Sequence, residues 1–462
     1  MDRSGYSSQS SRSLPTLPTL TTLQTPRYRA ITRTGLRRTR QWESLDPALQ
    51  RANDVVSRVL PFKTNAYVMD ELIDWSRVPD DPIYQLTFLQ QEMLDPEAFA
   101  RIAGLLDTGA DSAALKSAAD ELRLGLNPHP GGQLSHNVPS LDGRPLPGLQ
   151  HKYRETLLLF PSAGQTCHAY CSFCFRWPQF VGLDGYKFSA RTSEDALDYI
   201  RAHPEITDVL VTGGDPLTMS AASLRRYLEP LLSPEFAHID IRIGTKSLAY
   251  WPHRFTSDPD ADALLRLFED IGGAGTGRHL AIMGHYNHPR ELSTPTAQAA
   301  IARVRATGAQ IRMQSPIVRH INDDPETWAT LWRQGVRLGC VPYYMFVERD
   351  TGPRAYFELP LARALEIFRA AYTSVSGLCR TVRGPSMSAF PGKVCIEGVA
   401  TLGQGPEAER VFVLQLLQAR DPSLVRQPFF ATYDPEATWL GQLKPAQGAE
   451  RFFFEDSDEA GA

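Results

Sequence analysis

Three cysteines, Cys167, Cys171 and Cys174, stand within eight residues of one another, directly after the apolar run 156–160. A structural zinc site normally takes four ligands, often as two cysteine pairs far apart in sequence. The candidates for a fourth ligand are His168, which directly follows the first cysteine and is badly placed, and the scattered Cys340, Cys379 and Cys395. Loop cysteines at short spacings hold iron-sulfur clusters. The spacing therefore favours a [4Fe-4S] cluster with one open iron; a zinc knuckle or three incidental thiols are the alternatives.

A pair of glycines, Gly213 and Gly214, follows the apolar run 208–212 and precedes Asp215. Adjacent glycines let the backbone approach a ligand closely, and the Asp215 carboxylate could accept a hydrogen bond from an amino group. A plain tight turn explains the pair equally well when it is taken alone.

Short apolar runs recur from residue 156 onward and are separated by helical patterns. The apolar runs are 156–160, 208–212, 238–244, 279–284, 310–317 and 341–347, and the helical patterns lie at 192–203, 221–232, 261–270, 294–307 and 326–334. Strands that alternate with helices predict a parallel sheet with right-handed crossovers. We therefore expect an α/β fold with a partial (β/α)6 barrel over residues 151–360. In such barrels the chemistry lies in the loops after the strands, and the cysteine loop follows the first strand.

Three further segments flank this region. Residues 1–45 are rich in Ser, Thr, Pro and Arg, which predicts a disordered basic tail; a polyanion-binding arm or a transit peptide is the alternative. Residues 46–150 show amphipathic helical patterns and then a linker rich in Gly and Pro. We interpret residues 361–462 as a C-terminal α+β extension.

The composition is that of an ordinary globular protein. The 462 residues are 42% hydrophobic and carry a formal net charge of -4, so no nucleic-acid or membrane partner is indicated. Half of the six cysteines lie in one loop, which is typical of a metal site in a reducing compartment and not of a disulfide scaffold. No apolar run approaches the roughly 20 residues that span a bilayer. We expect a cytoplasmic protein.

Taken together, the motifs resemble those of the lysine 2,3-aminomutase family of radical S-adenosylmethionine (SAM) enzymes. In order, they are CxxxCxxCFR at 167–176, GGDPL at 213–217, IRIGTK at 241–246, HYNHP at 285–289, MQS at 313–315 and PYYMF at 342–346. The match covers roughly residues 150 to 360, with softer similarity in the helices before it and near Lys393.

The resemblance implies how a radical would be made. Cys167, Cys171 and Cys174 would bind three irons of a [4Fe-4S] cluster, and SAM would chelate the fourth. Reductive cleavage of SAM would then release a 5'-deoxyadenosyl radical, with the electron coming from a donor such as flavodoxin or ferredoxin. The residues expected to line SAM are Gly213, Gly214 and Asp215 at its methionine part, and Thr245 and Gln314 near its ribose or carboxylate.

The resemblance also implies pyridoxal phosphate (PLP), bound as an imine to a lysine after the barrel. Lys393, which follows Gly392, is the best counterpart of that lysine. Tyr153, His285 and His288 would be its neighbours, although His288 fits equally well as a histidine that only satisfies its own loop. Arg176 matches the family's arginine for the substrate carboxylate, a role that suits a planar guanidinium.

The chain departs from the family at the phosphate and at the substrate. Lys152 and Thr156 stand where the family has two phosphate-binding arginines, so one cation is replaced and the other is lost. Arg349, and either Ser386 or Ser388, stand where lysine aminomutases have acids for the distal ammonium. An arginine there would repel an ammonium and attract an anion.

Lysine is therefore not the expected substrate; an acidic amino acid, or a larger substrate with an anionic group, fits better. If Asp350 took the place of Arg349, this inference would fail. The family's C-terminal zinc-binding cysteines are missing, so dimerisation by that route is not expected, although another homo-oligomer is compatible with the sequence.

Our first hypothesis is thus an aminomutase that moves an amino group between adjacent carbons of an amino acid other than lysine through a PLP imine. The alternative is a PLP-independent radical SAM enzyme that catalyses another rearrangement, an elimination or an oxidation. A hypothesis from another class is a non-catalytic metal-binding protein that uses the barrel as an interaction platform.

Overall fold

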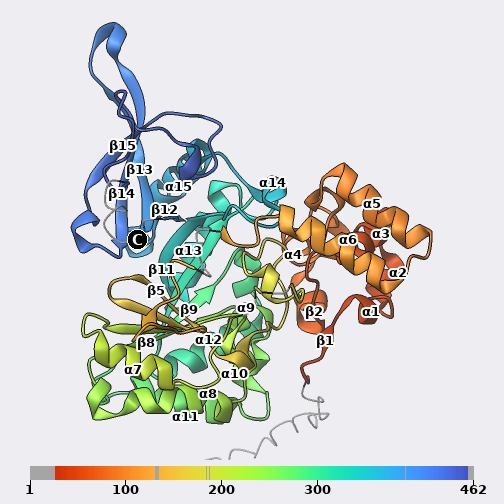
Figure 1. Ribbon diagram of the computed structural model, residues 1–462. Coiled ribbons are helices and arrows are strands. Elements are labelled where there is room, and N and C mark those ends of the chain that lie inside the picture. The colour runs from red at the N-terminus through yellow and green to blue at the C-terminus, as the bar shows by residue number, and fades with distance from the viewer. Residues whose placement is uncertain (1–25, 131–134, 184, 187, 391, 456–462) are drawn as a thin grey trace, which may run out of the picture.

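The computed structural model describes residues 26–130, 135–183, 185–186, 188–390 and 392–455 (Figure 1). A helical N-terminal region lies to one side of a central α/β region, and a C-terminal extension of antiparallel strands rises above it (Figure 1). One sheet of eleven strands, in the order β15-β14-β13-β12-β11-β10-β9-β8-β7-β6-β5, runs through both the central region and the extension.

The six predicted strands are present and parallel to one another, so the α/β class is confirmed. Each lies within two residues of its predicted bounds: β6 (Thr156–Leu159), β7 (Asp208–Val211), β8 (Asp240–Thr245), β9 (Leu280–His285), β10 (Gln310–Ile317) and β11 (Val341–Val347).

Helices connect these strands, as their sequence patterns predict. The longer ones are α7 (Glu194–Ala202), α8 (Ala221–Leu228), α11 (Ala261–Gly272), α12 (Pro295–Ala306) and α13 (Pro325–Arg337), and the short α9 (Ser247–Tyr250) and α10 (His253–Thr256) follow β8. Side chains cap several of their first turns, for example Thr294 on the backbone N–H of Ala297 and Asp324 on that of Thr327. Apolar faces such as Leu264, Phe268 and Ile271 then pack into the main core.

The C-terminal region extends the sheet. Its elements are α14 (Arg354–Phe357), α15 (Leu361–Thr373), β12 (Arg383–Ser388), β13 (Gly392–Leu402), β14 (Glu409–Ala419) and β15 (Pro428–Thr432). Strand β12 pairs parallel with β11, and the later strands pair antiparallel around a second core. The β13–β14 hairpin projects from the top of the molecule in Figure 1.

At the other edge, β5 (Leu149–Tyr153) pairs antiparallel with β6 and meets the C-terminal strands. The Tyr153 hydroxyl lies 3.2 Å from Ser388 Oγ, and the amide of Arg154 donates to the carbonyl of Ala419 at 3.3 Å. The two ends of the curved sheet therefore approach each other and surround an interior space.

In its described part, residues 26–130, the N-terminal region holds six α-helices and a small two-stranded sheet. They are α1 (Arg33–Leu36), α2 (Arg40–Ser44), α3 (Pro47–Val56), α4 (Pro82–Thr87), α5 (Pro96–Asp107) and α6 (Ser112–Gly125), with β1 (Ala30–Ile31) paired to β2 (Thr64–Asn65). A further short hairpin, β3 (Ser140–Leu141) and β4 (Arg144–Pro145), lies in the linker. None of the described helices has the length and apolar character needed to cross a membrane.

The expectation of a disordered tail over residues 1–45 is wrong for residues 26–45. Leu36 and Trp42 are buried in the main core, and their burial stabilises the short helices that carry them. In addition, the Tyr28 hydroxyl donates to the carbonyl of His168 in the cysteine loop at 3.0 Å. The rest of the predicted tail, residues 1–25, lies outside the described residues.

Candidate active site

A cavity of about 340 Å³ lies within the curve of the sheet and is lined by side chains from β5 to β14. It brings together nearly all of the predicted site residues, although they come from distant parts of the chain. These are Tyr153, Cys167, Cys171, Cys174, Arg176, Gly213, Gly214, Asp215, Thr245, His285, Gln314, Arg349 and Lys393.

The cysteine loop follows β6, and all three of its thiols line this cavity. Burial raises the pKa of each thiol, and for Cys174 the pKa rises to about 12. The neighbouring thiols raise the pKa of Cys167 further, so the three groups lie near one another. Among the described residues, no three Cys, His, Asp or Glu side chains gather closely enough to bind a single metal ion. Loop thiols at such short spacings suit an iron-sulfur cluster, whose separate irons take separate thiolates.

A tyrosine on α9 contacts one of these thiols. The Tyr250 hydroxyl lies 3.2 Å from Cys171 Sγ, and the Lys246 amine lies 4.7 Å from the centre of the tyrosine ring. Lys246 is itself held by an ion pair with the buried Glu291 at 2.6 Å. A metal-bound thiolate sulfur can only accept a hydrogen bond, so Tyr250 would donate to it.

The paired glycines bring the second loop directly against the cysteine loop. A Cβ on Gly214 would lie 2.5 Å from both the backbone nitrogen and the carbonyl oxygen of Thr166, the residue before Cys167. The amide of Asp215 donates to that same Thr166 carbonyl at 2.6 Å, and Gly213 has a φ of 142°. These glycines therefore allow the loop after β7 to pack closely against the cysteine loop beside the cavity.

The Asp215 carboxylate does not serve as a free acceptor for an amino group. It is 2% exposed and already accepts hydrogen bonds from Thr245 Oγ1 at 2.8 Å, Ser247 Oγ at 2.9 Å and the amides of Leu217 and Lys246. All three residues of this segment line the cavity, but these hydrogen bonds occupy the Asp215 carboxylate, so the expected acceptor role of the side chain is not supported. The hydroxyl of Thr245 is likewise directed at Asp215.

Lys393, on β13, is 7% exposed and reaches into the cavity among aromatic rings. Its Nζ lies 4.0 Å from the centre of the Tyr344 ring and 5.2 Å from that of Tyr153, and it has no hydrogen-bonding partner among the described residues. Burial lowers the pKa of this amine well below its usual value, and the charge of Arg242 lowers it further. A neutral, unbonded amine is a competent nucleophile toward an aldehyde.

Two guanidinium groups line another wall of the cavity. The Cζ atoms of Arg176 and Arg349 lie 5.1 Å and 5.2 Å from the centre of the same ring, that of Phe175. Arg176 Nη1 and Arg349 Nε are buried without hydrogen-bonding partners among the described residues. Because buried donors are normally satisfied, these N–H groups indicate an anionic ligand.

The structure favours Arg349 over Asp350 as the residue that faces the cavity. Asp350 does not line it and instead accepts a hydrogen bond at its backbone oxygen from Asn127 Nδ2, at 2.6 Å. Of the two candidate serines, Ser388 lines the cavity, whereas Ser386 is fully buried and its hydroxyl lies 3.4 Å from the carbonyl of Met345.

Sequence reasoning missed Glu348, which also lines the cavity next to Arg349. Burial raises the pKa of this carboxyl group well above its usual value and so disfavours its charged form, which the nearby Arg349 favours in part. The only signal in the sequence was its position directly after a predicted strand.

His288 was expected beside the PLP site, and this expectation is wrong. It does not line the cavity; its Nδ1 accepts a hydrogen bond from the amide of Arg290 at 3.2 Å and caps the following turn. Burial lowers its pKa to about 4. The alternative, a histidine that satisfies its own loop, is correct, while His285 does line the cavity.

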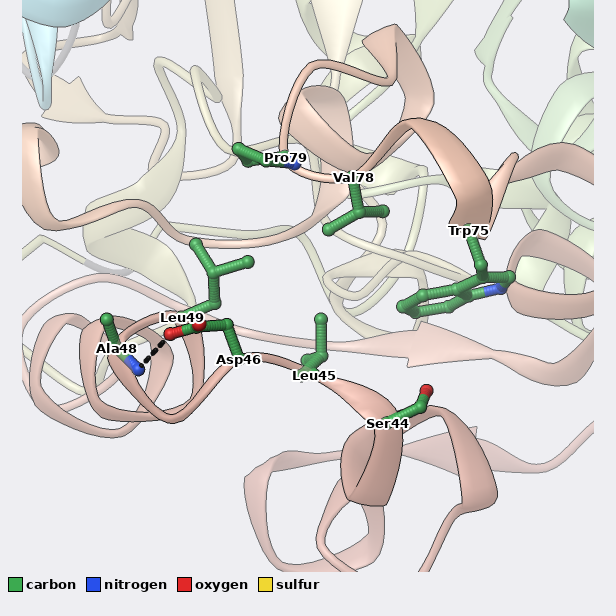
Figure 2. Close-up of a pocket in the computed structure, with 8 residues that line it drawn as sticks. All are labelled: Ser44, Leu45, Asp46, Ala48, Leu49, Trp75, Val78 and Pro79. Carbon is green, nitrogen blue, oxygen red and sulfur yellow. Dashed lines mark hydrogen bonds between the residues drawn. The ribbon is translucent and has the colours of Figure 1, made fainter.

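A second cavity, of about 530 Å³, lies among the N-terminal helices (Figure 2). It is lined by Ser44, Leu45, Asp46, Ala48, Leu49, Trp75, Val78 and Pro79. The one carboxylate in this set, on Asp46, already accepts from the amide of Ala48 at 2.7 Å as the N-cap of α3 (Figure 2). The single carboxylate of this lining therefore already serves as a helix cap.

Comparison with known proteins identifies the family. No model of a protein family matches the chain. A protein of Aquifex aeolicus, provisionally assigned as an L-lysine 2,3-aminomutase, is 34% identical over 399 residues, which are 86% of this chain and 91% of the relative. The chain belongs to the lysine 2,3-aminomutase family. The resemblance seen in the motifs is thereby confirmed: this member is a radical SAM enzyme of the aminomutase type, whose family implies a [4Fe-4S] cluster and SAM.

Other relatives of this aminomutase-family member match about half of its length. The L-lysine 2,3-aminomutase of Clostridium subterminale is 28% identical over 51% of this chain and 53% of its own. The glutamate 2,3-aminomutase of Clostridioides difficile is 29% identical over 49% of this chain and 50% of its own. Among solved structures, a radical SAM methyltransferase from Sphaerobacter thermophilus aligns with a TM-score of 0.34 at 18% identity, over 51% of this chain and 68% of that one.

Proposed function

We propose that this enzyme moves an amino group between adjacent carbons of an acidic amino acid, with PLP attached to Lys393. The curved sheet would act as a partial (β/α)6 barrel that holds the reacting groups in one enclosed space. The observation that carries the proposal is the unbonded amine of Lys393 in the same cavity as Cys167, Cys171 and Cys174.

The residues around Lys393 fit PLP. The rings of Tyr153, Tyr344 and Phe346 lie 4.0 to 5.3 Å from its Nζ and suit a flat aromatic cofactor. PLP, when bound, would supply a conjugated system that delocalises an unpaired electron on the substrate. Lys393 would attach the cofactor, and the aromatic side chains would orient it and exclude water.

Another part of the same cavity lining fits the cluster and SAM. The three thiols would hold the cluster, and the loop at Gly213 and Gly214 would form the wall against SAM. Together these cofactors, when bound, would supply the radical that removes a substrate hydrogen. We expect the electron to come from a small redox protein such as flavodoxin or ferredoxin.

The guanidinium groups favour a dicarboxylate substrate. Because both lie close to the Phe175 ring, their central carbons are at most about 10 Å apart. An amino acid with two carboxylates would span this interval, with Arg176 on the α-carboxylate and Arg349 on the distal one. Because burial disfavours the charged form of Glu348, this carboxyl group would offset the charge of Arg349 only weakly, and a distal ammonium would be repelled. That a relative is named as a glutamate 2,3-aminomutase supports this substrate class.

The proposal is tested with anoxically purified, cluster-reconstituted protein. We expect bound PLP with an absorbance that borohydride bleaches, and loss of that band in Lys393→Ala but not in the exposed-lysine control Lys444→Ala. With SAM, a reductant and glutamate, chromatography coupled to mass spectrometry should detect 5'-deoxyadenosine and the β-amino acid 3-aminoglutarate, which is an isomer of glutamate. SAM cleavage without PLP binding would instead support the PLP-independent alternative. Absence of SAM cleavage would contradict both.

A further inference from the structure

We propose that Arg242 on β8, together with Lys152 on β5, binds the phosphate of PLP. In this way β8, which lies two strands away from β6 in the sheet, supplies the cation that the chain has lost at Thr156. The inference rests on the proposed function, because it assumes that PLP is the cofactor at Lys393.

The first support is the position of Arg242. Thr156 and Arg242 lie on β6 and β8, which flank β7, and both side chains line the cavity. Arg242 Nη2 donates to Thr156 Oγ1 at 3.0 Å. The guanidinium therefore occupies the space beyond the short threonine side chain, where a longer cationic side chain at position 156 would end.

The second support is the way this guanidinium is held. Arg242 Nε donates to Asp208 Oδ1 at 2.7 Å, and the Asp208 carboxylate also accepts from the Thr156 hydroxyl at 3.1 Å. Arg242 Nη1 has no hydrogen bond to another described residue, and the side chain is 17% exposed. Asp208 and Thr156 thus fix one edge of the guanidinium. The N–H groups of Nη1 are left for a ligand in the cavity, and such a planar set of donors matches a phosphate.

The third support is the distribution of charge around Lys393. Arg242, Arg383 and Lys152 all lower the pKa of the Lys393 amine, so three cations lie near the point where PLP would attach. Lys152 donates to the carbonyl of Ser388 at 3.3 Å, and its own pKa is lowered to about 7 by burial and by nearby arginines. Several buried cations with only one carboxylate nearby repel one another. A dianionic phosphate bound among them would reduce this repulsion.

The test compares two ligands that differ only in the phosphate. Apo-protein is titrated at low ionic strength with PLP and with pyridoxal, and binding is followed by equilibrium dialysis and visible absorbance. Arg242→Gln is expected to weaken PLP binding about 10- to 100-fold, the usual effect of losing a charged hydrogen-bonding partner, and to leave pyridoxal binding unchanged. Thr156→Arg in the same background is expected to restore PLP binding.

The matched control is Arg312→Gln. Arg312 lies on β10 with its guanidinium 5.1 Å from the Tyr343 ring centre and does not line the cavity, so binding of both ligands should stay at the wild-type level. Asp208→Asn, which removes the carboxylate that competes for Arg242, is expected to tighten PLP binding. Circular dichroism verifies that each variant is folded.

The outcomes separate the two proposals. Unchanged PLP affinity in Arg242→Gln would overturn this inference while leaving PLP at Lys393 intact. Equal loss of PLP and pyridoxal binding would also overturn it, because Arg242 would then shape the cavity without recognising phosphate. If the wild-type protein bound neither ligand, the proposed function itself would fail, and this inference with it.

Discussion

The side-chain nitrogen of Lys393 lies 4.0 Å from the centre of the Tyr344 ring, and no carboxylate among the described residues pairs with it. Most of the charges that act on this amine are cations, and Asp208 alone opposes them. The fold therefore disfavours the protonated lysine and keeps the neutral form that can attack an aldehyde. At any pH where the unfolded chain would carry a protonated Lys393, the buried amine therefore lowers the stability of the folded protein.

This relationship predicts a pH-dependent gain in stability for Lys393→Met in the apo-protein. The folded-state pKa lies well below the usual 10.5, so between these two values the unfolded chain binds a proton that the folded protein does not. The contribution of Lys393 to the stability of the wild-type protein therefore becomes more favourable as pH rises toward 10.5. We expect the variant to be more stable than wild type at pH 7 and the difference to shrink by pH 10, as measured by urea unfolding. A difference that is the same at both pH values would contradict the shifted pKa.

A second prediction concerns Gly214→Ala. The added Cβ would meet the backbone of Thr166 at 2.5 Å, and backbone cannot yield as a flexible side chain can. We expect a loss of about 1–3 kcal/mol in the free energy of unfolding, and a lower iron content after cluster reconstitution because Cys167 is displaced. Both are measured on the same preparation, by urea unfolding and by iron analysis.

The control for this variant is Gly104→Ala in α5. A Cβ there has open space, and alanine favours a helix over glycine by about 1 kcal/mol. The control should therefore be slightly more stable than wild type and take up iron normally. Normal iron uptake by Gly214→Ala would show that contact between the two loops is not needed to form the cluster site.

The sequence predicted the parallel strands well because buried strands appear as short apolar runs between helical patterns. It did not predict that β12 would continue the parallel sheet. Residues 383–388 read Arg-Gly-Pro-Ser-Met-Ser, without an apolar alternation, and they form a strand because the backbone of β11 offers a free edge. Such pairing depends on tertiary contacts that local propensity does not encode.

The site shows the same division. The three cysteines are close in sequence, so their spacing alone indicated a common site. Arg242 and Glu348 were missed because the sequence does not show directly whether a side chain on a strand, or just after it, points into the cavity. Alternation along β8 would have placed Arg242 on the same side as Gly244, and this signal was available. For His288, by contrast, the local sequence could not distinguish a histidine that caps a turn from one that lines the cavity.

A third prediction is that Tyr250→Phe lowers the reduction potential of the cluster. The Tyr250 hydroxyl lies 3.2 Å from Cys171 Sγ, and a hydrogen bond to a ligand sulfur stabilises the more negative, reduced cluster. A bond of about 1 kcal/mol corresponds to a shift of roughly 50 mV for one electron. The potential is measured by redox titration with electron paramagnetic resonance detection. Tyr227→Phe, on α8 and outside the cavity, serves as the control, and an unshifted potential in Tyr250→Phe would remove this tuning role.

A fourth prediction concerns the substrate and follows from Arg349. Arg349→Asp would replace the cation beside Phe175 by an acid, so an acidic amino acid should be repelled and lysine accepted more readily. We expect kcat/KM for glutamate to fall at least about tenfold, which corresponds to about 1.4 kcal/mol, and turnover of lysine to rise. Mass spectrometry of the β-amino acid products measures both. Asp350→Asn should leave the preference unchanged, because Asp350 does not line the cavity. If Arg349→Asp kept the wild-type preference, the distal carboxylate would have to bind elsewhere, and the neighbouring Lys152 would be the next cation to test.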